Sequence, residues 1–487
     1  MRSRTTRGGL LALGLIAAIG AGYLATLRAG HDWGDDFSAY LQHAKNIAEG
    51  RPYASGGYLY NPANPIGPPA CPPVFPLLLA PVYALFGLNL TAMKAAVVLW
   101  FLAALFMMFL VFRRLRPDAE ALALVAIIGV NPLFWSFKDQ VLSDVPFLCF
   151  TYASFWLIAQ HDLQRASPRP RWLLALATGL VWYLAYGTRS LGLLIPAALV
   201  IALAIRRQRP SRSLLIALLL LAGLIALQNL WLHTDRAYLA QLGNAPKTMW
   251  SHAAYYSQEL RDLWRNGYSK PLMKALFLTV NGLALLGYGS ALRRGVTMLE
   301  VFPLLYLAAI FSWPHYQGIR YLFPVIPLYV AYALSGIRSL PWGRRNTTRR
   351  LATATVLIAI FASYAAAYTK VDYGPIKEGV AQRETVELFD YIRRDTDPSS
   401  VIVFAKPRVL SLYTGRRSAV YPLTSDGREI VAYLRRIGAA YVVASPIFFT
   451  DQSLLQPVLQ RHAALFEPVY ANAVFTMYRM AVEPPPR

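Results

Sequence analysis

The chain has 487 residues, of which 56% are hydrophobic and 15% charged, with a mean hydropathy of +0.37. An average soluble protein carries about 25% charged residues, so this composition excludes a soluble enzyme and indicates a polytopic membrane protein. The formal net charge of +23 does not indicate a nucleic-acid partner, because the basic residues lie in short clusters between apolar stretches.

Eleven uncharged stretches of 16 to 22 residues recur along residues 1–369 and are predicted to be membrane-spanning helices. The first follows Arg2, Arg4 and Arg7. Because ten further stretches come after it, we interpret it as an uncleaved signal anchor. The predicted spans cover residues 10–27, 95–112, 121–137, 145–160, 172–188, 190–205, 213–234, 275–292, 301–319, 321–337 and 351–369.

Arginines lie at alternate connections between these stretches, as the positive-inside rule describes for cytoplasmic loops. With eleven spans, twenty arginines fall on one side, whereas the three short connections opposite hold one basic residue each, Lys138, Arg189 and Arg320. We therefore predict a cytoplasmic N-terminus and an extracytoplasmic C-terminus. Nine of the 13 acidic residues in 1–369 fall on the outer side, so polar chemistry is expected there.

Residues 28–94 form the first long outer loop. An amphipathic helix along the membrane surface is predicted near its start, because apolar side chains repeat at helical spacing with polar ones between them. The apolar positions are Phe37, Tyr40, Leu41, Ala44, Ile47 and Ala48. A Pro- and Gly-rich stretch follows over residues 61–76. Residues 74–88 are apolar but broken by proline, which favours a re-entrant helix over a complete span.

A second outer loop, rich in Trp, Tyr and His, covers residues 233–270. The tail, residues 370–487, is much more charged than the spans, with 15 basic and 12 acidic residues. Strands are predicted at 401–404, 440–444 and 473–478, and helices at 384–394 and 430–437. The sequence therefore predicts an all-α polytopic membrane domain of about eleven helices over 1–369 and a small extracytoplasmic α/β domain over 370–487.

The segment His31-Asp32-Trp33-Gly34-Asp35-Asp36 is the strongest candidate for chemistry. It places two adjacent carboxylates, Asp35 and Asp36, where the first span leaves the membrane and just ahead of the surface helix. Aspartate also favours the N-cap of a helix, where its charge suits the helix dipole. Capping accounts for one carboxylate more easily than for two. A structural role as a helix cap and a catalytic role therefore both stay open for Asp35 and Asp36.

The other candidates lie in short outer connections. Asp144 stands at the entry to the fourth span, where an ionisable group usually lines a cavity or finds a partner, although it can also cap its helix. Lys138, Arg189 and Arg320 are basic residues on a side that otherwise excludes them from its short turns. Interfacial arginines often anchor a helix in the membrane, but a guanidinium also binds phosphate through paired donors.

Histidines and cysteines form no recognisable framework. The two cysteines lie on either side of a predicted span and indicate neither a disulfide nor a metal site. Five histidines are scattered over the predicted outer side without metal-ligand spacing, so a divalent metal is possible but no pattern supports one, and no cofactor is predicted. These histidines are His31, His43, His233, His252 and His315.

Several segments, in this order, resemble the GT-C superfamily of membrane glycosyltransferases, and most closely its branch of protein O-mannosyltransferases and lipid A aminoarabinose transferases. They are the acidic first loop with Gly34-Asp35-Asp36, Tyr40 and Ala44, GRPY at 50–53, Pro72-Pro73 before FPLLLAPVYALFG, LSDVPF at 142–147, TRSLGLLIP at 188–196 and RYLFPVIPLY at 320–329. The resemblance covers most of residues 1–340, whereas the tail is similar to the family's outer domains in position only.

The resemblance implies a sugar donor carried on a polyprenyl phosphate and a first-loop aspartate that acts on the acceptor. The catalytic carboxylate would be Asp35 or Asp36, with Asp144 in support. The partners of the donor phosphate would be Lys138, Arg189 and Arg320, and the residues lining the substrate would be Tyr40, His43, His315 and Tyr316.

These expectations describe an inverting glycosyltransferase of a bacterial inner membrane, which transfers a sugar on the outer face to a lipid, glycan or protein acceptor. Neither the sugar nor the acceptor follows from the residues. The alternative is a transporter or flippase of lipid-linked sugars. Transporters often contain internal repeats around a midplane site, whereas this sequence has no evident repeat and its charge lies at one surface, which favours an enzyme.

Overall fold

A computed structural model describes residues 2–163, 171–232, 245–265, 267–313, 315–341 and 346–481 of the protein. His233 and the rest of 233–244, in the second predicted outer loop, lie outside these residues. The chain divides into two compact units, each assembled from two separate segments. The first unit contains Met1–Leu27 and Lys94–Tyr373, and the second contains Arg28–Met93 and Gly374–Arg487.

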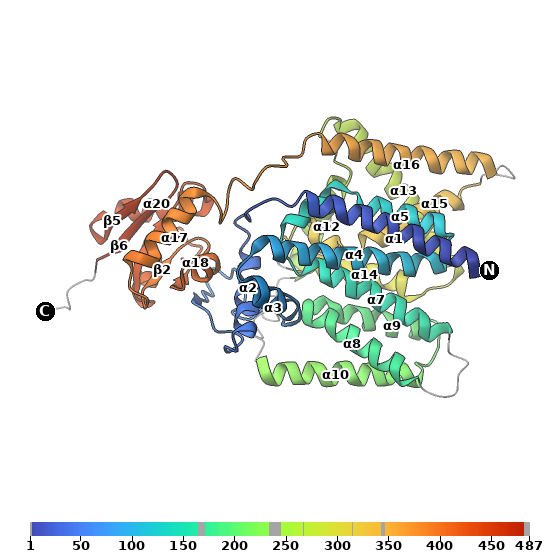
Figure 1. Ribbon diagram of the computed structural model, residues 1–487, viewed down its shortest axis with the longest axis horizontal. Helices are drawn as coiled ribbons and strands as arrows, with labels where there is room; N and C mark the ends of the chain where they lie inside the picture. Colours follow the sequence, from blue (N-terminus) through green and yellow to red (C-terminus); the bar gives the residue numbers. More distant parts are fainter. Residues whose placement is uncertain are drawn as a thin grey trace. The chain divides into compact units, whose positions relative to one another are not determined.

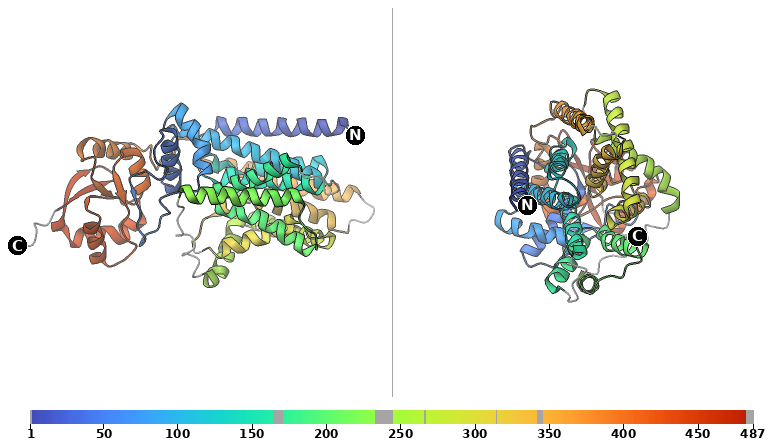
Figure 2. Two further views of the ribbon diagram at one scale, coloured as in Figure 1. Left: turned by 90° about the horizontal axis from the view of Figure 1, so that it is seen from below. Right: turned by 90° about the vertical axis from the view of Figure 1, so that its right-hand side faces the viewer.

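The first unit is a bundle of helices that run alongside one another (Figure 1), as two further views also show (Figure 2). Short 3-10 turns precede three of its helices: η1 (Phe137–Asp139), η2 (Ser190–Leu193) and η4 (Ile319–Leu322). The helices are α1 (Arg2–Ala25), α4 (Leu90–Leu115), α5 (Asp118–Gly129), α6 (Pro132–Ser136), α7 (Asp144–Leu163), α8 (Trp172–Thr188), α9 (Leu194–Ile205), α10 (Arg212–Leu232), α12 (Ala245–Asp262), α13 (Lys270–Arg294), α14 (Met298–Phe311), α15 (Ile326–Ser339) and α16 (Asn346–Tyr368).

Each of the eleven predicted stretches overlaps one of these helices. Judged by helix length and composition, however, fewer than eleven of the helices qualify as membrane spans. Among the described residues, α1, α4, α10, α13 and α16 are long and apolar enough to cross a membrane. A sixth candidate is α5 together with α6 and η1, a pair that is bent by 47°. Large apolar side chains such as Leu10, Leu219 and Leu285 are exposed, as expected for helices that face lipid. The protein is therefore a multi-pass membrane protein.

The stretch at 121–137 is not one straight helix, because the chain turns at Asn131. The Asn131 side chain accepts hydrogen bonds from the backbone N–H groups of Leu133 and Phe134, at 2.9 and 3.3 Å, and so caps α6. Pro132 occupies the first turn, where its missing N–H leaves no helical hydrogen bond unmade. The second segment then ends in η1, which carries Lys138 and Asp139.

Helices α13 and α15 pack closely because each presents a glycine to the backbone of the other. A Cβ atom at Gly287 would lie 1.9 Å from the Tyr332 carbonyl oxygen, and one at Gly336 would lie 1.9 Å from the Leu283 carbonyl oxygen. Any larger residue would force the helices apart. Small residues at such crossings are a common way for membrane helices to gain packing contacts.

The second unit combines two helices of the first long loop, residues 28–94, with an α/β fold of the tail. The loop supplies α2 (Asp35–Ala48), β1 (Tyr58–Leu59) and α3 (Val74–Phe86). The tail supplies α17 (Arg383–Asp395), β2 (Val401–Val403), α18 (Pro407–Thr414), β3 (Arg417–Ala419), α19 (Gly427–Arg436), β4 (Ala439–Ala444), α20 (Gln456–Arg461), β5 (Phe466–Ala471) and β6 (Thr476–Met480), with a π-helical turn η5 (Asp451–Leu455) and a 3-10 turn η6 (Ala463–Leu465).

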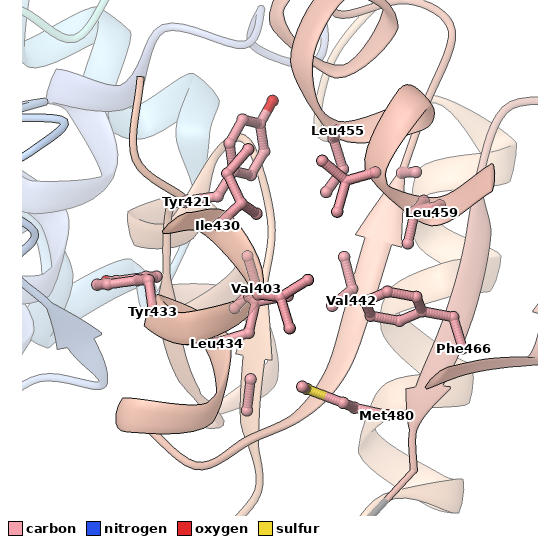
Figure 3. Packing of buried hydrophobic residues seen from close by; sticks show 14 of the residues in the cluster. Val403, Tyr421, Ile430, Tyr433, Leu434, Val442, Leu455, Leu459, Phe466 and Met480 are labelled. Atoms are coloured by element: carbon pink, nitrogen blue, oxygen red, sulfur yellow. The ribbon is translucent and has the colours of Figure 1, made fainter. Parts of the chain in front are cut away.

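The six strands form one sheet in the order β1-β3-β2-β4-β6-β5. Strands β1, β3, β2 and β4 are parallel, and β4, β6 and β5 are antiparallel. Alternate apolar residues of the sheet pack under helices of the tail. Val403 and Val442, on adjacent strands, contribute to a buried core with Leu434 of α19 and Leu459 of α20 (Figure 3). The strands at 401–404, 440–444 and 473–478 were expected; β1, β3 and β5 were not.

Strand β1 explains why residues 28–93 belong with the tail. Tyr58 lies opposite Ser418 in the register of β1 with β3. Just beyond β1, the Asn61 and Asn64 side chains donate hydrogen bonds to the carbonyl oxygens of Val420 and Tyr421, at 2.8 and 2.9 Å. The structure thus groups residues 28–93 with 374–487, whereas the sequence analysis placed them within a 1–369 domain.

Part of the polar face of α2 is buried against protein. Whereas Gln42 and Lys45 are half-buried, Ser38, His43 and Asn46 are at most 3% exposed. The loop after α2 covers them: the Asn46 side chain donates to the Tyr53 carbonyl oxygen at 2.8 Å and to that of Ser55. Helix α2 ends at Ala48, just before Gly50 and Pro52. The re-entrant segment is α3, which contains Pro81 and is too short to cross a membrane.

Candidate functional site

Asp35 and Asp36 begin α2, but neither is its N-cap. That position belongs to Gly34, whose backbone N–H donates to Oδ1 of Asp32 at 3.0 Å. The capping interpretation of Asp35 and Asp36 is therefore wrong. Both carboxylates lie in the first turn, where the positive end of the helix dipole favours negative charge.

Arg408 pairs with both carboxylates within the second unit. Its Nε lies 3.5 Å from Oδ2 of Asp35, and its Nη1 lies 3.8 Å from Oδ1 of Asp36. The side chains of Arg408 and Asp35 are 4% and 8% exposed, whereas that of Asp36 is 37% exposed. Asp35 and Arg408 thus form a buried ion pair, with Asp36 at its more accessible edge.

Arg408 also contacts residues of the loop between α2 and α3. Its Nη2 donates to the Pro68 carbonyl oxygen at 2.8 Å, and its guanidinium lies 5.0 Å from the centre of the Tyr58 ring. The residue sits in the first turn of α18, where the helix dipole disfavours positive charge. A basic residue at the start of a helix indicates that a nearby acidic group compensates its charge. The sequence contained this indication of a site at Arg408, but it was not recognised there.

Burial raises the pKa of Asp35 to about 6. The positive charges of Arg408 and Lys406 limit the rise, and the neighbouring Asp36 adds to it. Among the described residues no side chain donates a well-formed hydrogen bond to either Asp35 oxygen, although the backbone N–H of Arg408 also favours the charged form of the carboxylate. A buried carboxylate that titrates near neutral pH is well suited to accept a proton.

His43 serves the fold, although the sequence made it a candidate for lining the substrate. Its Nε2 accepts a hydrogen bond from the backbone N–H of Cys71 at 3.2 Å, so the ring proton is on Nδ1, which donates to the Tyr53 carbonyl oxygen at 3.0 Å. Burial lowers the pKa of His43 to about 4, so the ring is neutral at physiological pH. Both nitrogens are therefore used to attach the loop to α2. Tyr40, three residues earlier, packs edge-on against Phe75 of α3.

In the first unit, Asp139 lies between two buried lysines. The Nζ of Lys138 is 2.5 Å from Oδ2 of Asp139, and the Nζ of Lys94 is 3.9 Å from Oδ1. Lys138 also lies over the Trp135 ring, 3.7 Å from its centre. The sequence analysis did not identify Lys94 as a candidate site residue, because it stands alone at the start of an apolar stretch. A lone charge in such a place does indicate a buried partner or a functional site.

Asp144 lies between the two arginines that the sequence singled out. The Nη1 of Arg189 is 2.5 Å from Oδ1 of Asp144, and the Nη1 of Arg320 is 3.9 Å from Oδ2. Asp144 opens α7 and its side chain is 3% exposed. Arg189 stacks over the Tyr321 ring at 4.2 Å, while Arg320 also donates to the backbone and side-chain oxygens of Gln317. Asp144 follows Asp139 in the chain with only residues 140–143 between them, so the two groups of charges are close in sequence.

His315 and Tyr316 belong to a different group. Tyr316 packs against His252 and Tyr255 of α12, with ring centres 4.5 and 4.4 Å apart. Both His315 and Tyr316 are exposed, and Tyr316 is 54% exposed. Nothing in the described part of the first unit connects them with Asp144 through a hydrogen bond or ion pair. In the same described residues, no three His, Cys, Asp or Glu side chains gather closely enough to hold a metal ion.

One part of the sequence matches a family model. Residues 70–232 match the model of the family described as dolichyl-phosphate-mannose-protein mannosyltransferase. That segment contains Lys94, Lys138, Asp144 and Arg189 but ends well before Arg320 and Arg408. A search of curated proteins finds no match to the sequence.

The fold is similar to those of several solved membrane glycosyltransferases. ArnT from Cupriavidus metallidurans, solved with undecaprenyl phosphate bound, is 14% identical with a TM-score of 0.56, and the match covers 97% of this chain and 98% of ArnT. The oligosaccharyltransferase AglB from Archaeoglobus fulgidus, solved with an inhibitory peptide and dolichol phosphate, is 13% identical with a TM-score of 0.57, covering 89% and 69%. The arabinofuranosyltransferase AftD from Mycobacteria is 13% identical with a TM-score of 0.50, covering 96% and 41%.

These matches confirm the resemblance to GT-C glycosyltransferases that the sequence indicated, and they establish the fold class. ArnT, AglB and AftD all belong to that superfamily, and the family matched over 70–232 is one of its branches. The transporter alternative finds no support among them.

Proposed function

We propose that the protein transfers a sugar from a polyprenyl-phosphate donor to an acceptor at the outer face of a bacterial inner membrane. The observation that carries this proposal is the buried Asp35 carboxylate, whose pKa is raised to about 6 and which pairs with Arg408, in a chain with the GT-C fold. The undecaprenyl phosphate bound to ArnT and the dolichol phosphate bound to AglB support a lipid phosphate as the carrier.

In the proposed reaction, Asp35 is the general base. It takes the proton from the acceptor hydroxyl or amine as the acceptor atom attacks C1 of the sugar. The bond from C1 to the phosphate oxygen breaks in the same step, and its electron pair leaves with the polyprenyl phosphate. A single displacement inverts the configuration at C1. A base with a pKa near 6 suits this role, because it is ionised at neutral pH yet still binds a proton.

The cations of the first unit are proposed to bind the donor phosphate. Lys94 and Lys138 lie beside Asp139, and Arg189 and Arg320 lie beside Asp144. Each carboxylate orients two cations, so Asp144 is a positioning residue for Arg189 rather than a second base. Preorganised cations stabilise the charge that develops on a leaving phosphate.

Replacing Arg189 by lysine is expected to weaken use of the polyprenyl-phosphate donor by about 10- to 100-fold, since a charged hydrogen bond is worth roughly 1.5–3 kcal/mol. Lysine keeps the charge but cannot bind Asp144 with one nitrogen and phosphate with another. Initial rates measured against donor concentration test this. Arg206→Lys is the control, because Arg206 is an exposed arginine outside the proposed phosphate site. Unchanged donor kinetics in Arg189→Lys would make Arg189 a membrane anchor.

The orientation of the protein is also a proposal. Reporter fusions after Arg116 and Arg209 are expected to indicate the cytoplasm, and a fusion after Asp397 the periplasm. The physical reason is the concentration of arginines in alternate connections. A cytoplasmic location for Asp397 would contradict both the orientation and the assignment of the site to the outer face.

Mass spectrometry of envelope glycolipids and glycoproteins tests the function itself. A deletion strain is expected to lack one sugar residue on one class of acceptor and to accumulate the polyprenyl-phosphate sugar. The wild-type gene should restore the acceptor mass, and a gene encoding Asp35→Asn should not. An unchanged envelope in the deletion strain would contradict the proposal. Absence of the donor from the outer leaflet would instead indicate a flippase.

A further inference from the structure

Between the ends of α13 and α15, in the first unit, lies a cavity of about 500 Å³ that plays no part in the proposed reaction. Its polar lining consists of three arginines and three serines: Arg293, Arg294, Arg338, Ser290, Ser335 and Ser339. Both helices end here, because Arg294 and Ser339 are their last residues. The arrangement therefore places three guanidinium groups around one hollow, together with serine hydroxyls that already bind within the wall: Ser339 donates to the Ser335 carbonyl oxygen at 3.1 Å, and the Ser335 hydroxyl accepts from Arg116 at 2.5 Å.

The local charge is positive. Glu120 of α5 is shared between two arginines: its Oε1 lies 3.5 Å from Nη1 of Arg338, and its Oε2 lies 3.4 Å from Nη1 of Arg116. One carboxylate thus balances part of the charge of Arg338, while Arg293 and Arg294 add two more positive charges at the cavity wall. Arg294 donates to the Ser290 hydroxyl at 2.8 Å, which turns its guanidinium along the wall.

The other part of the cavity wall is apolar. Leu285 and Leu286 line it and are 73% and 51% exposed. They belong to α13, one of the helices long and apolar enough to cross a membrane. A ligand that suits the whole cavity carries an anionic phosphate at one end and a hydrocarbon chain at the other.

We propose that this cavity binds an anionic phospholipid. The phosphate diester accepts hydrogen bonds from Arg293, Arg294 and Arg338, and an acyl chain lies along Leu285 and Leu286. Guanidinium groups pair well with phosphate oxygens, and basic pockets between membrane helices on the cytoplasmic side characteristically take such headgroups. These arginines lie on the side that the sequence predicts to be cytoplasmic. These arginines could also serve only to orient the protein in the membrane. That role would not require them to line a cavity together with serine hydroxyls.

Two pairs of variants separate a lipid site from general attraction to charge. A Cβ atom at Gly289, which lines the cavity, would meet nothing within 4 Å, so Gly289→Leu fills the hollow without altering its charge. Gly282→Leu is the matched control on the same helix, since a Cβ atom there also meets nothing within 4 Å. Arg293→Gln/Arg294→Gln removes charge from the cavity, and Arg206→Gln/Arg209→Gln removes it from exposed arginines beyond α9.

Thermal unfolding of the purified full-length protein in neutral detergent measures binding, because a ligand that binds the folded state raises Tm. Titrated phosphatidylglycerol is expected to raise Tm, and phosphatidylcholine and inorganic phosphate are not. The double arginine variant should weaken the apparent affinity about 30-fold, given roughly fivefold for each arginine. Gly289→Leu should abolish the shift, and both controls should keep it.

The proposal is overturned if phosphatidylcholine gives the same shift, or if Gly289→Leu responds as Gly282→Leu does. An equal effect of inorganic phosphate would indicate a free-anion site and would also overturn it. Sugar transfer by Gly289→Leu is expected to be near that of wild type under saturating donor. Failure of the lipid proposal therefore leaves the proposed glycosyltransferase activity untouched.

Discussion

Replacing Asp35 by asparagine is expected to lower the rate of sugar transfer by about 100- to 10,000-fold, the usual cost of losing a general base. Asparagine matches aspartate in shape but cannot take a proton from the acceptor. Asp35→Asn also removes one partner of the buried Arg408, so Tm is expected to fall, although Asp36 remains 3.8 Å from Arg408. Transfer measured with purified protein and saturating donor, together with Tm, separates loss of chemistry from loss of stability.

Asp36→Asn is the matched control for that experiment. Asp36 is also in the first turn of α2 and beside Arg408, but it is far more exposed than Asp35. It should therefore keep most of its activity. The reverse result, a large loss in Asp36→Asn and a small one in Asp35→Asn, would assign the base to Asp36. Full activity in both variants would contradict a carboxylate base in this loop.

Replacing Arg408 by glutamine is expected to destabilise the protein and to shift its pH dependence. Breaking a buried ion pair typically costs about 3–5 kcal/mol, because one charge is left without its partner. Arg408 is 4% exposed, so water does little to compensate. The variant should show a lower Tm, and its transfer activity should require a higher pH than that of wild type.

The direction of the pH effect follows from the pKa of Asp35. Burial has raised that pKa to about 6, above the ordinary value of 3.8, and Arg408 limits the rise. Activity of the wild type should fall as pH is lowered through about 6, when the base becomes protonated. Without Arg408 the pKa rises further, so the fall begins at higher pH. The loss of stability should be smaller at pH 5, where Asp35 is neutral, than at pH 8.

Arg416→Gln is the matched control for stability in the same unit. Arg416 donates to the carbonyl oxygens of Arg393 and Thr396, at 2.8 and 2.9 Å, so its loss should lower Tm without moving the pH profile. Arg408→Lys keeps the charge and should return the inflection toward pH 6. An inflection that stays in place in Arg408→Gln would show that Arg408 supports the fold but not the protonation state of Asp35.

The sequence by itself determined the features that depend on local pattern. Apolar stretches of sufficient length located the helices of the first unit, because burial in lipid needs a continuous apolar run. The acidic pair at 35–36 and the isolated Lys138, Arg189 and Arg320 were visible as charges where the chain otherwise excludes them. The resemblance to the GT-C superfamily also followed from the order of these segments.

Only the tertiary structure decided which of these charges meet. Arg408 reaches Asp35 because β1, from the first loop, pairs with β3 of the tail, and Asp144 meets Arg189 and Arg320 from three separate segments. Part of the polar face of α2 is buried because the loop after it folds back to supply the carbonyl oxygens of Tyr53 and Ser55. Such pairings join residues far apart in the chain. Their partners are selected by backbone pairing and packing, which leave no local signature in hydrophobic periodicity or charge.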